Sequence, residues 1–462
     1  MKNINDMTPL AIDLPEDVLR AKWCGDFTRC NRLISIYLNN PKVPECTKER
    51  LRIEEKIIAA LPVDFQYTEE EAFQMTKEKI SDLTYDEFEN LIDTSAIEWI
   101  YINGKVYCQN RFLSTLLKVH PELAERAGLP KASESPARKE LNKNIADMKK
   151  DGKSEWHMRL RAKLKLHDDA FVPNETLKVH LPIPKDAINM KNIKILSSSF
   201  EPKTIGSMSD PQRTIYFEEK LSENKQFDVE YEYDSVVNYI DLKDKKNIEL
   251  AGKTEQPNFE TQELYPHIRF TPFIKALCAE LSGDEKNPVL LARRFYDYCT
   301  TKVTYSYMRE YFLITEIPDY CGLGLKGDCG VQALLFITLC RCAGIPAKWQ
   351  SGVYVNPYDV GCHDWAQFYI APFGWLFADP SFGGSAFRAG DYERHDYYFG
   401  NLDPFRMVAN SEYQGALIPE KKHLRVDPYD NQRGEAEYED KGISYSERDC
   451  DWDLIECYKK EV

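Results

Sequence analysis

Residues 156–166 read WHMRLRAKLKL, a stretch in which apolar side chains alternate with mostly charged ones. Successive side chains of a β-strand point to opposite faces, so this alternation predicts a strand with one face in a core and the other in water. Residues 227–234, FDVEYEYD, repeat the pattern, and three β-favouring stretches lie between them: TLKVHLPIP, NIKILSSSF and RTIYFEE. We therefore expect residues 151–250 to form an antiparallel, sandwich-like β-module.

The preceding residues 1–150 carry apolar side chains at helical spacing, as in FTRCNRLISIYL and ERLRIEEKIIAAL. Thr68 and Thr84 are each followed three residues later by Glu, which predicts capping boxes that begin two helices. Asn103-Gly104 separates two β-favouring runs and predicts a hairpin near 98–109. We expect a mostly helical domain, followed by PKASESPARKELNKN as a linker or an exposed, partly helical segment.

Length and charge narrow the class of protein. The chain has 462 residues, and single cores stop growing near ~250–300 residues, so we expect three domains. Its net charge of −15 argues against nucleic acid and against anionic membranes as binding partners.

We find no secretory signal and no apolar run near ~18 residues, and the 13 cysteines lack disulfide or zinc spacing. We expect a cytoplasmic protein with reduced thiols and without a metal or cofactor; the sequence favours no particular oligomeric state.

A candidate nucleophile lies in residues 327–349, GDCGVQALLFITLCRCAGIPAKW. Apolar residues at steps of three and four predict a buried helix from about 329 to 343, which Gly344 and Pro346 would end. Cys329 would then lie in the first turn, where free N–H groups and the helix dipole lower the pKa of a thiol. A lone cysteine at such a position is more often small core filler, so the nucleophile hypothesis depends on a nearby base.

The candidate base is His363, the first residue of HDWAQFYI. This stretch and GWLFADP read as two strands of a hairpin. A three-residue turn would pair Ile370 with Gly374 and Trp365 with Asp379. His363 and Asp379 would then share a face as diagonal neighbours, close enough for the carboxylate to orient the imidazole.

Five short motifs, GDCG, GIPAK, HDW, GW and ADP, occur in the order found in the transglutaminase-like superfamily, and residues 285–385 resemble its core. This superfamily shares its catalytic arrangement with papain-like cysteine proteases. The resemblance implies a transglutaminase-like (papain-type) α+β catalytic domain at 255–420, with Cys329 as nucleophile, His363 as general base and acid, and Asp379 as the orienting carboxylate. Lys348 and Gln367 depart from the usual Arg and the frequent Glu, and neither is a catalytic position.

The resemblance also extends the expected fold class. The β-module before the core looks like the immunoglobulin-like β-sandwich that many relatives carry, so the whole chain is expected to be multidomain α+β.

The remaining residues, 421–462, are rich in Glu, Asp and Tyr and poor in aliphatic residues. We expect them to form an acidic tail that packs on the catalytic domain or stays mobile.

The implied chemistry is acyl transfer from an amide through a thioester on Cys329. The leading hypothesis is a cysteine hydrolase with a peptide or protein substrate. One alternative is amide transfer to an amine, of the transglutaminase type, and another is a non-catalytic scaffold that binds proteins. The Cys329 backbone N–H is the natural first oxyanion donor; Tyr305 is a candidate second donor, and Trp365 a candidate substrate contact.

Overall fold

The N-terminal part of the molecule is mostly helical, as its apolar spacing predicts. The computed structural model describes residues 5–131 and 135–461. Its first elements are η1 (Thr8–Ala11), α1 (Glu16–Trp23), α2 (Phe27–Asn39), α3 (Glu45–Asp64), α4 (Glu69–Lys79), α5 (Tyr85–Asp93), α6 (Phe112–Val119), α7 (Pro121–Arg126) and α8 (Pro136–Asp151). Both predicted capping boxes are confirmed, at the start of α4 and of α5.

The predicted hairpin is also confirmed. Strands β2 (Trp99–Ile102) and β3 (Lys105–Cys108) pair antiparallel around Asn103 and Gly104, whose φ angles are 50° and 77°. A two-residue turn of the hairpin type needs such positive φ values, which Asn and Gly tolerate. The short strand β1 (Tyr67–Thr68) adds to β3. The polar stretch after this region forms α8 from Pro136 onward, and residues 132–134 of that stretch lie outside the described residues.

The middle of the chain forms antiparallel strands, which confirms the alternating pattern. One sheet has the order β18-β4-β9-β6, and the other has the order β17-β5-β8-β7. Their strands are β4 (Lys153–Leu166), β5 (Thr176–Pro182), β6 (Met190–Ser198), β7 (Thr204–Ile205), β8 (Thr214–Lys220), β9 (Phe227–Asn238), β17 (Glu435–Glu437) and β18 (Arg448–Lys459). The immunoglobulin-like character of this region stays a prediction, because each sheet takes a strand from the C-terminal end of the chain.

The C-terminal residues do not form the expected acidic tail. Strand β18 pairs with β4 along nearly its whole length, and β17 pairs with β5. In β18, alternate side chains from Asp449 to Asp453 are exposed, while Cys450, Trp452 and Leu454 are partly buried against the core. The tail prediction was wrong because the acidic residues are only the solvent face of an amphipathic strand, and Lys163 of β4 binds Asp453 across it at 2.6 Å.

The third region contains a five-stranded sheet with the order β15-β14-β13-β12-β16. Its strands are β12 (Ala347–Asn356), β13 (Asp359–Ile370), β14 (Gly374–Ala378), β15 (Phe399–Gly400) and β16 (Arg406–Asn410). The helices of this region are α9 (Lys245–Lys253), α10 (Pro272–Ser282), α11 (Pro288–Thr301), α12 (Ile317–Gly324), α13 (Cys329–Cys342), α14 (Pro380–Arg388) and α15 (Tyr392–Tyr397). Shorter elements are β10 (Thr304–Tyr305), β11 (Lys326–Gly327), η3 (Tyr311–Leu313) and η4 (Tyr445–Glu447).

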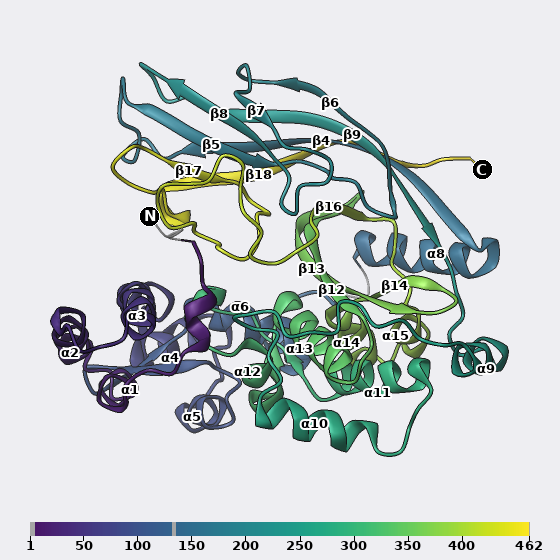
Figure 1. Ribbon diagram of the computed structural model, residues 1–462, viewed down its shortest axis with the longest axis horizontal. Coiled ribbons are helices and arrows are strands. Elements are labelled where there is room, and N and C mark those ends of the chain that lie inside the picture. The colour runs from purple at the N-terminus through teal and green to yellow at the C-terminus, as the bar shows by residue number, and fades with distance from the viewer. Residues whose placement is uncertain (1–4, 132–134, 462) are drawn as a thin grey trace.

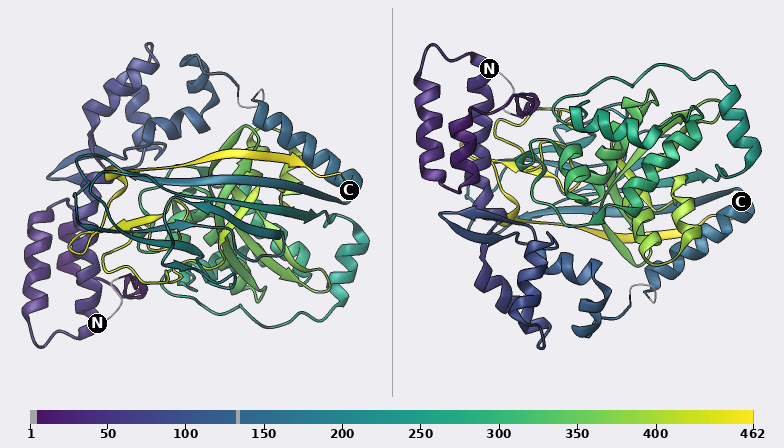
Figure 2. Two further views of the ribbon diagram at one scale, coloured as in Figure 1. Left: turned by 90° about the horizontal axis from the view of Figure 1, so that it is seen from above. Right: turned by 90° about the horizontal axis from the view of Figure 1, so that it is seen from below.

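These elements stack in layers. Figure 1 shows the long strands of the middle region above the β12–β16 sheet, with α10 to α15 below that sheet and α1 to α5 at one side. In both views of Figure 2 the C-terminal strand β18 runs beside β4. One continuous hydrophobic core joins α1–α3, the β-sheets and the third region, whereas α4–α7 enclose a smaller core of their own. Among the described helices, none is both long and apolar enough to span a lipid bilayer.

Candidate active site

Helix α13 brings Cys329 beside strand β13 of the five-stranded sheet. The predicted helix is confirmed from Cys329 to Cys342, and Asp328 caps it by accepting the Val331 N–H at 3.2 Å. Gly330 allows the first turn to pack tightly, because a Cβ there would lie 2.3 Å from the Tyr311 hydroxyl and 2.7 Å from the Trp349 ring. Cys329 is partly exposed, whereas Cys340 in the last turn of the helix is fully buried.

The hairpin of β13 and β14 joins His363 to Asp379. The predicted pairing of Ile370 with Gly374 is confirmed, and the ladder ends at the Ala366–Ala378 pair. Asp379 then begins α14 by accepting the Phe382 N–H at 2.9 Å. Its other carboxylate oxygen, Oδ2, lies 2.8 Å from Nε2 of His363. This hydrogen bond leaves Nδ1 as the imidazole nitrogen that can accept a proton.

Arg406 is a site residue that the sequence analysis missed. Its Nη2 donates to Oδ2 of Asp379 at 2.9 Å and to Oδ2 of Asp403 at 2.7 Å, and all three side chains are fully buried. Burial opposes the charge of Arg406, but Asp403 and Asp379 outweigh it and raise the arginine's pKa. One signal was available in the sequence: FRMVAN places an arginine inside an otherwise apolar strand, and a buried charge needs a partner.

These contacts fix the protonation states of the pair. Burial raises the pKa of Asp379, but His363 and Arg406 together hold it below the usual value for an aspartate. Burial lowers the pKa of His363, and Asp379 opposes this effect only in part. At neutral pH the pair is therefore an ionised carboxylate that accepts a hydrogen bond from a neutral imidazole.

The thiol of Cys329 contacts Asp364 in this structure. Cys329 Sγ donates to Oδ2 of Asp364 at 3.2 Å, and this is its only side-chain hydrogen bond to a described residue. Gln432 holds Asp364 by donating to its Oδ1 at 2.7 Å and donates also to the His363 carbonyl at 3.0 Å. Tyr311 donates its hydroxyl proton to Asp328 at 2.6 Å. Asp364 is a second site residue that the sequence analysis missed, although it lies next to His363.

The prediction of a lowered thiol pKa was wrong for this arrangement. Burial raises the pKa of Cys329 well above its ordinary value, and the nearby carboxylates of Asp364 and Asp328 raise it further. Burial also raises the pKa of Asp364 to about 7, with Asp328 adding to the shift. The negative charges beside the sulfur outweigh the favourable start of the helix, so the resting thiol is protonated.

Replacing Asp364 with asparagine is expected to lower the apparent pKa of Cys329, because the variant removes a charge that repels the thiolate. The rate of iodoacetamide labelling at Cys329, followed by mass spectrometry from pH 6 to 10, measures this pKa. In the unmodified protein the rate should still be rising above about pH 8.5, the value of a free thiol. Asp359→Asn, which removes another carboxylate of the same cleft, is the matched control and should leave the profile unchanged. A plateau below that pH, unaffected by Asp364→Asn, would contradict the account.

Cys329 and His363 line one large cleft, with a volume of ≈ 1390 Å³. Its walls come from three parts of the chain: the third region, the helices α6 and α7 of the N-terminal part, and the loop 427–433 before β17. Typical small-molecule pockets have volumes of about 300–1,000 Å³, so this cleft has room for a longer molecule.

The two further candidate residues have different positions. Tyr305 lines the cleft, and β10 places it beside Gly327 of β11, two residues before Cys329. Burial raises the pKa of Tyr305 well above its usual value, and Cys329 and Asp328 add to the shift, so its hydroxyl keeps its proton. Trp365 does not line the cleft: it is fully buried and donates its indole N–H to Gln350 at 2.9 Å. The structure therefore contradicts the prediction that Trp365 contacts substrate, because the side chain is needed in the core behind His363.

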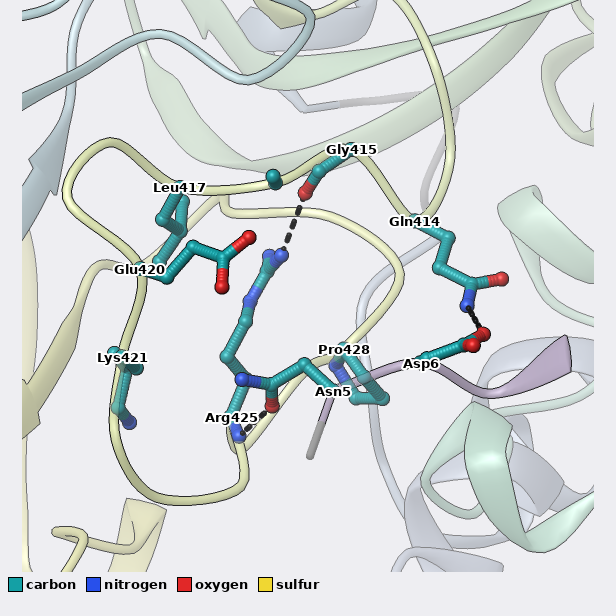
Figure 3. Close-up of a pocket in the computed structure, with 10 residues that line it drawn as sticks. Asn5, Asp6, Gln414, Gly415, Leu417, Glu420, Lys421, Arg425 and Pro428 are labelled. Carbon is teal, nitrogen blue, oxygen red and sulfur yellow. Dashed lines mark hydrogen bonds between the residues drawn. The ribbon is translucent and has the colours of Figure 1, made fainter. Parts of the chain in front are cut away.

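A smaller cavity, of ≈ 280 Å³, lies between residues 5–6 and the loop 414–428 (Figure 3). Arg425 extends along it and donates to the Gly415 carbonyl at 2.9 Å, while Gln414 donates to Asp6 at 3.4 Å. The described residues that line this cavity include no cysteine, histidine or serine. Its hydrogen bonds join the N-terminal residues to the loop, and the candidate chemistry stays in the larger cleft.

The comparison with known proteins supports the motifs read from the sequence. Residues 275–380 match the model of the transglutaminase-like superfamily. No curated protein matches the chain. Among solved structures, a candidate cysteine protease from Cytophaga hutchinsonii is 14% identical, with a TM-score of 0.40 over 67% of this chain and 92% of its own. The periplasmic domain of TgpA from Pseudomonas aeruginosa is 15% identical, with a TM-score of 0.28 over 55% of this chain and 96% of its own. By the family match, residues 275–380, which include Cys329, His363 and Asp379, form a transglutaminase-like core.

Proposed function

We propose that this protein is a cysteine hydrolase that cleaves peptide or protein amides through a thioester on Cys329. One observation carries the proposal: the imidazole of His363, held by Asp379 at 2.8 Å, lines the same cleft as the partly exposed thiol of Cys329. A nucleophile, a base and a group that orients the base are the parts that covalent acyl transfer requires.

In the proposed reaction the substrate turns the thiol of Cys329 from Asp364 towards His363. Nδ1 of His363 takes the thiol proton while Sγ attacks the amide carbon, and the carbonyl oxygen becomes an oxyanion. The same proton then passes to the amide nitrogen, the C–N bond breaks, and the amine leaves. Water, deprotonated by His363, attacks the thioester; the products are a carboxylic acid and the free thiol of Cys329.

The oxyanion needs donors on the side of the cleft that faces the carbonyl. The backbone N–H of Cys329, at the start of α13, is the first donor in this proposal. The Tyr305 hydroxyl is the second, supported by its position in the cleft and by its raised pKa, which keeps the donor proton in place. The Asp379–Arg406 contact holds the carboxylate ionised, so the positive charge that forms on His363 has a buried counterion.

Water is the proposed acceptor of the acyl group. Transfer to an amine would need a shielded thioester and a separate channel for the amine. The residues after the core are instead used in the two β-sheets, and in the described part of the chain only their loop 427–433 and Tyr445 reach the cleft. All 13 cysteines are free thiols, which is typical of proteins in a reducing compartment, so we propose a cytoplasmic location, which cell fractionation can check.

The acceptor can be tested by product partition. The protein is incubated with a cleavable peptide and a labelled primary amine at about millimolar concentration, near typical values of KM, and both products are followed by mass spectrometry. Carboxylate product with negligible labelled amide is expected. Predominant labelled amide would contradict hydrolysis and identify an amide transferase. A preparation of Cys329→Ala serves as the control for contaminating peptidases.

A further inference from the structure

One wall of the cleft is basic and comes from the helical N-terminal part of the chain. Arg111 is the N-cap residue immediately before α6, and Lys118 lies in the last turn of this helix; both line the cleft together with Cys329. Two more cations line the same cleft, Arg138 near the start of α8 and Arg388 at the end of α14.

Helix α6 is fixed against strand β10 and Tyr307, and β10 pairs with β11, the strand that leads to the nucleophile. The Thr115 hydroxyl accepts the Tyr307 N–H at 3.1 Å, and Lys118 Nζ donates to the Tyr307 hydroxyl at 3.2 Å. The guanidinium carbon of Arg111 lies 3.6 Å from the centre of the Tyr307 ring, and Lys118 Nζ lies 4.1 Å from the centre of the Tyr305 ring. Because Tyr305 pairs with Gly327, these cations are held close to the start of α13.

The cations of this wall form no ion pair with a described residue, although Arg111 and Lys118 act at longer range to lower the pKa of Asp328 against the effect of its burial. Among the described residues, no carboxylate lies within ion-pair distance of Arg111, Lys118, Arg138 or Arg388. Nη1 of Arg138 is buried, and within residues 5–131 and 135–461 it has no hydrogen-bond partner. By contrast, Arg309, which also lines the cleft, forms an ion pair with Glu98. Unpaired cations that gather in one cleft of a chain with a net charge of −15 call for an anionic partner from outside.

Three carboxylates of the same cleft, Glu310, Asp427 and Asp430, do not fill this role. Burial raises the pKa of Glu310 and of Asp427 well above their usual values, and it raises the pKa of Asp430 to about 7. A neighbouring carboxylate adds to each shift: Asp427 to that of Glu310, Asp430 to that of Asp427, and Asp364 to that of Asp430. These three carboxylates carry a reduced negative charge at neutral pH, so they offset less of the positive charge of the basic wall.

We infer that Arg111 and Lys118 form a subsite that binds a carboxylate of the substrate next to the scissile amide, so that the protein selects acidic peptides. The inference rests on the proposed hydrolase function and names its substrate class. A guanidinium stacked flat on an aromatic ring keeps its N–H edge free, and that edge matches the two oxygens of a carboxylate. The carboxylate can belong to an Asp or Glu side chain or to a free C-terminus.

Peptide binding to Cys329→Ala protein tests the subsite without any need for turnover. Four fluorescent peptides of one sequence are compared: Glu at the variable position with an amidated end, Gln with a free end, Gln with an amidated end, and Lys with an amidated end. The first two separate a side-chain carboxylate from a terminal one. At least one of them should bind about tenfold more tightly than the neutral peptide, as expected for a charged hydrogen bond, and the Lys peptide should bind most weakly.

Charge variants in the Cys329→Ala background test whether Arg111 and Lys118 cause the preference for acidic peptides. Arg111→Gln with Lys118→Gln should reduce the preference for the acidic peptide to about twofold or less, and Lys118→Glu should reverse it in favour of the Lys peptide. The matched controls Arg32→Gln and Lys79→Gln, at exposed positions outside the cleft, should keep the full preference. Circular dichroism checks that each variant is folded; the reversal by Lys118→Glu cannot arise from unfolding.

The two proposals fail in different ways. Equal binding of all four peptides, or a preference that survives the double variant, would overturn the subsite. Charge-selective binding by Cys329→Ala, together with a complete lack of cleavage of the same peptides by the unmodified protein, would keep the subsite and refute the hydrolase. Cleavage without any charge preference would refute the subsite alone.

Discussion

Replacing Cys329 with alanine is expected to abolish amide cleavage while leaving the fold intact. Loss of a covalent nucleophile typically lowers kcat by at least about 10⁴-fold, because binding and oxyanion stabilisation alone remain. The stability cost should stay below about 1 kcal/mol, since Cys329 is partly exposed at the end of a helix. Peptide cleavage and chemical denaturation of the same preparations measure the two effects.

Cys340→Ala is the matched control for this prediction. Cys340 lies on the same helix, is fully buried, and should be more costly to stability while leaving cleavage within a small factor of the unmodified protein. If Cys329→Ala instead destabilised the protein by ~2–5 kcal/mol, as a truncated core leucine does, the residue would be core filler. Retained cleavage by this variant would also remove Cys329 from the mechanism.

Replacing Arg406 with methionine is expected to have the largest effect on stability. The side chain is fully buried between Asp379 and Asp403, so the variant leaves two carboxylates in the core without their cation. Breaking a buried ion pair in this way typically costs about 3–5 kcal/mol. Activity should fall as well, because the pKa of Asp379 rises when Arg406 is removed and the carboxylate no longer holds His363 as firmly.

A second substitution separates this charge effect from a packing effect. Asp403→Asn added to Arg406→Met removes one of the two unpaired carboxylates and should recover part of the lost free energy of unfolding. Arg32→Met, at an exposed position, should change stability by less than about 0.5 kcal/mol. Urea denaturation of the four proteins gives the comparison. A loss below about 1 kcal/mol for Arg406→Met would mean that the buried network adds little to stability.

The parts of the site that the sequence predicted depend on short-range signals. The apolar spacing after Cys329 defined α13, and the three-residue turn fixed the register that brings His363 to Asp379. In both cases the interacting residues lie within one helix or one hairpin. A period of side chains and a turn length are therefore sufficient to place them.

The parts that the sequence did not predict depend on residues far apart in the chain. The raised pKa of Cys329 follows from Asp364 on another element and from burial, neither of which the local sequence around Cys329 reveals. Arg406 reaches Asp379 only because β16 joins the sheet beside β12. The acidic residues after 421 suggested a tail. Their alternation with apolar residues in β18 produces a buried face only when β4 lies beside that strand, and the sequence does not show this pairing.

The basic wall of the cleft also depends on residues that lie far apart in the chain. Arg111 and Lys118 belong to the helical N-terminal part, which the resemblance to known proteins did not cover, and only tertiary packing brings α6 to the cleft. The fold therefore gives the N-terminal helices a position from which they can act on substrate choice. Their smaller separate core, formed by α4–α7, supports α6 independently of the catalytic sheet.

The most direct measurement of the central claim is the location of the acyl group during turnover. The protein is mixed with a cleavable peptide, quenched in acid within the first turnovers, digested, and analysed by mass spectrometry. The account predicts one hydroxylamine-sensitive adduct, with the mass of the acyl part of the substrate, on the peptide that contains Cys329. In His363→Ala the adduct should form only as far as this variant can still acylate Cys329. In Cys329→Ala the adduct should be absent. An adduct on any of the other 12 thiols, or cleavage that persists without an adduct on Cys329, would contradict the account.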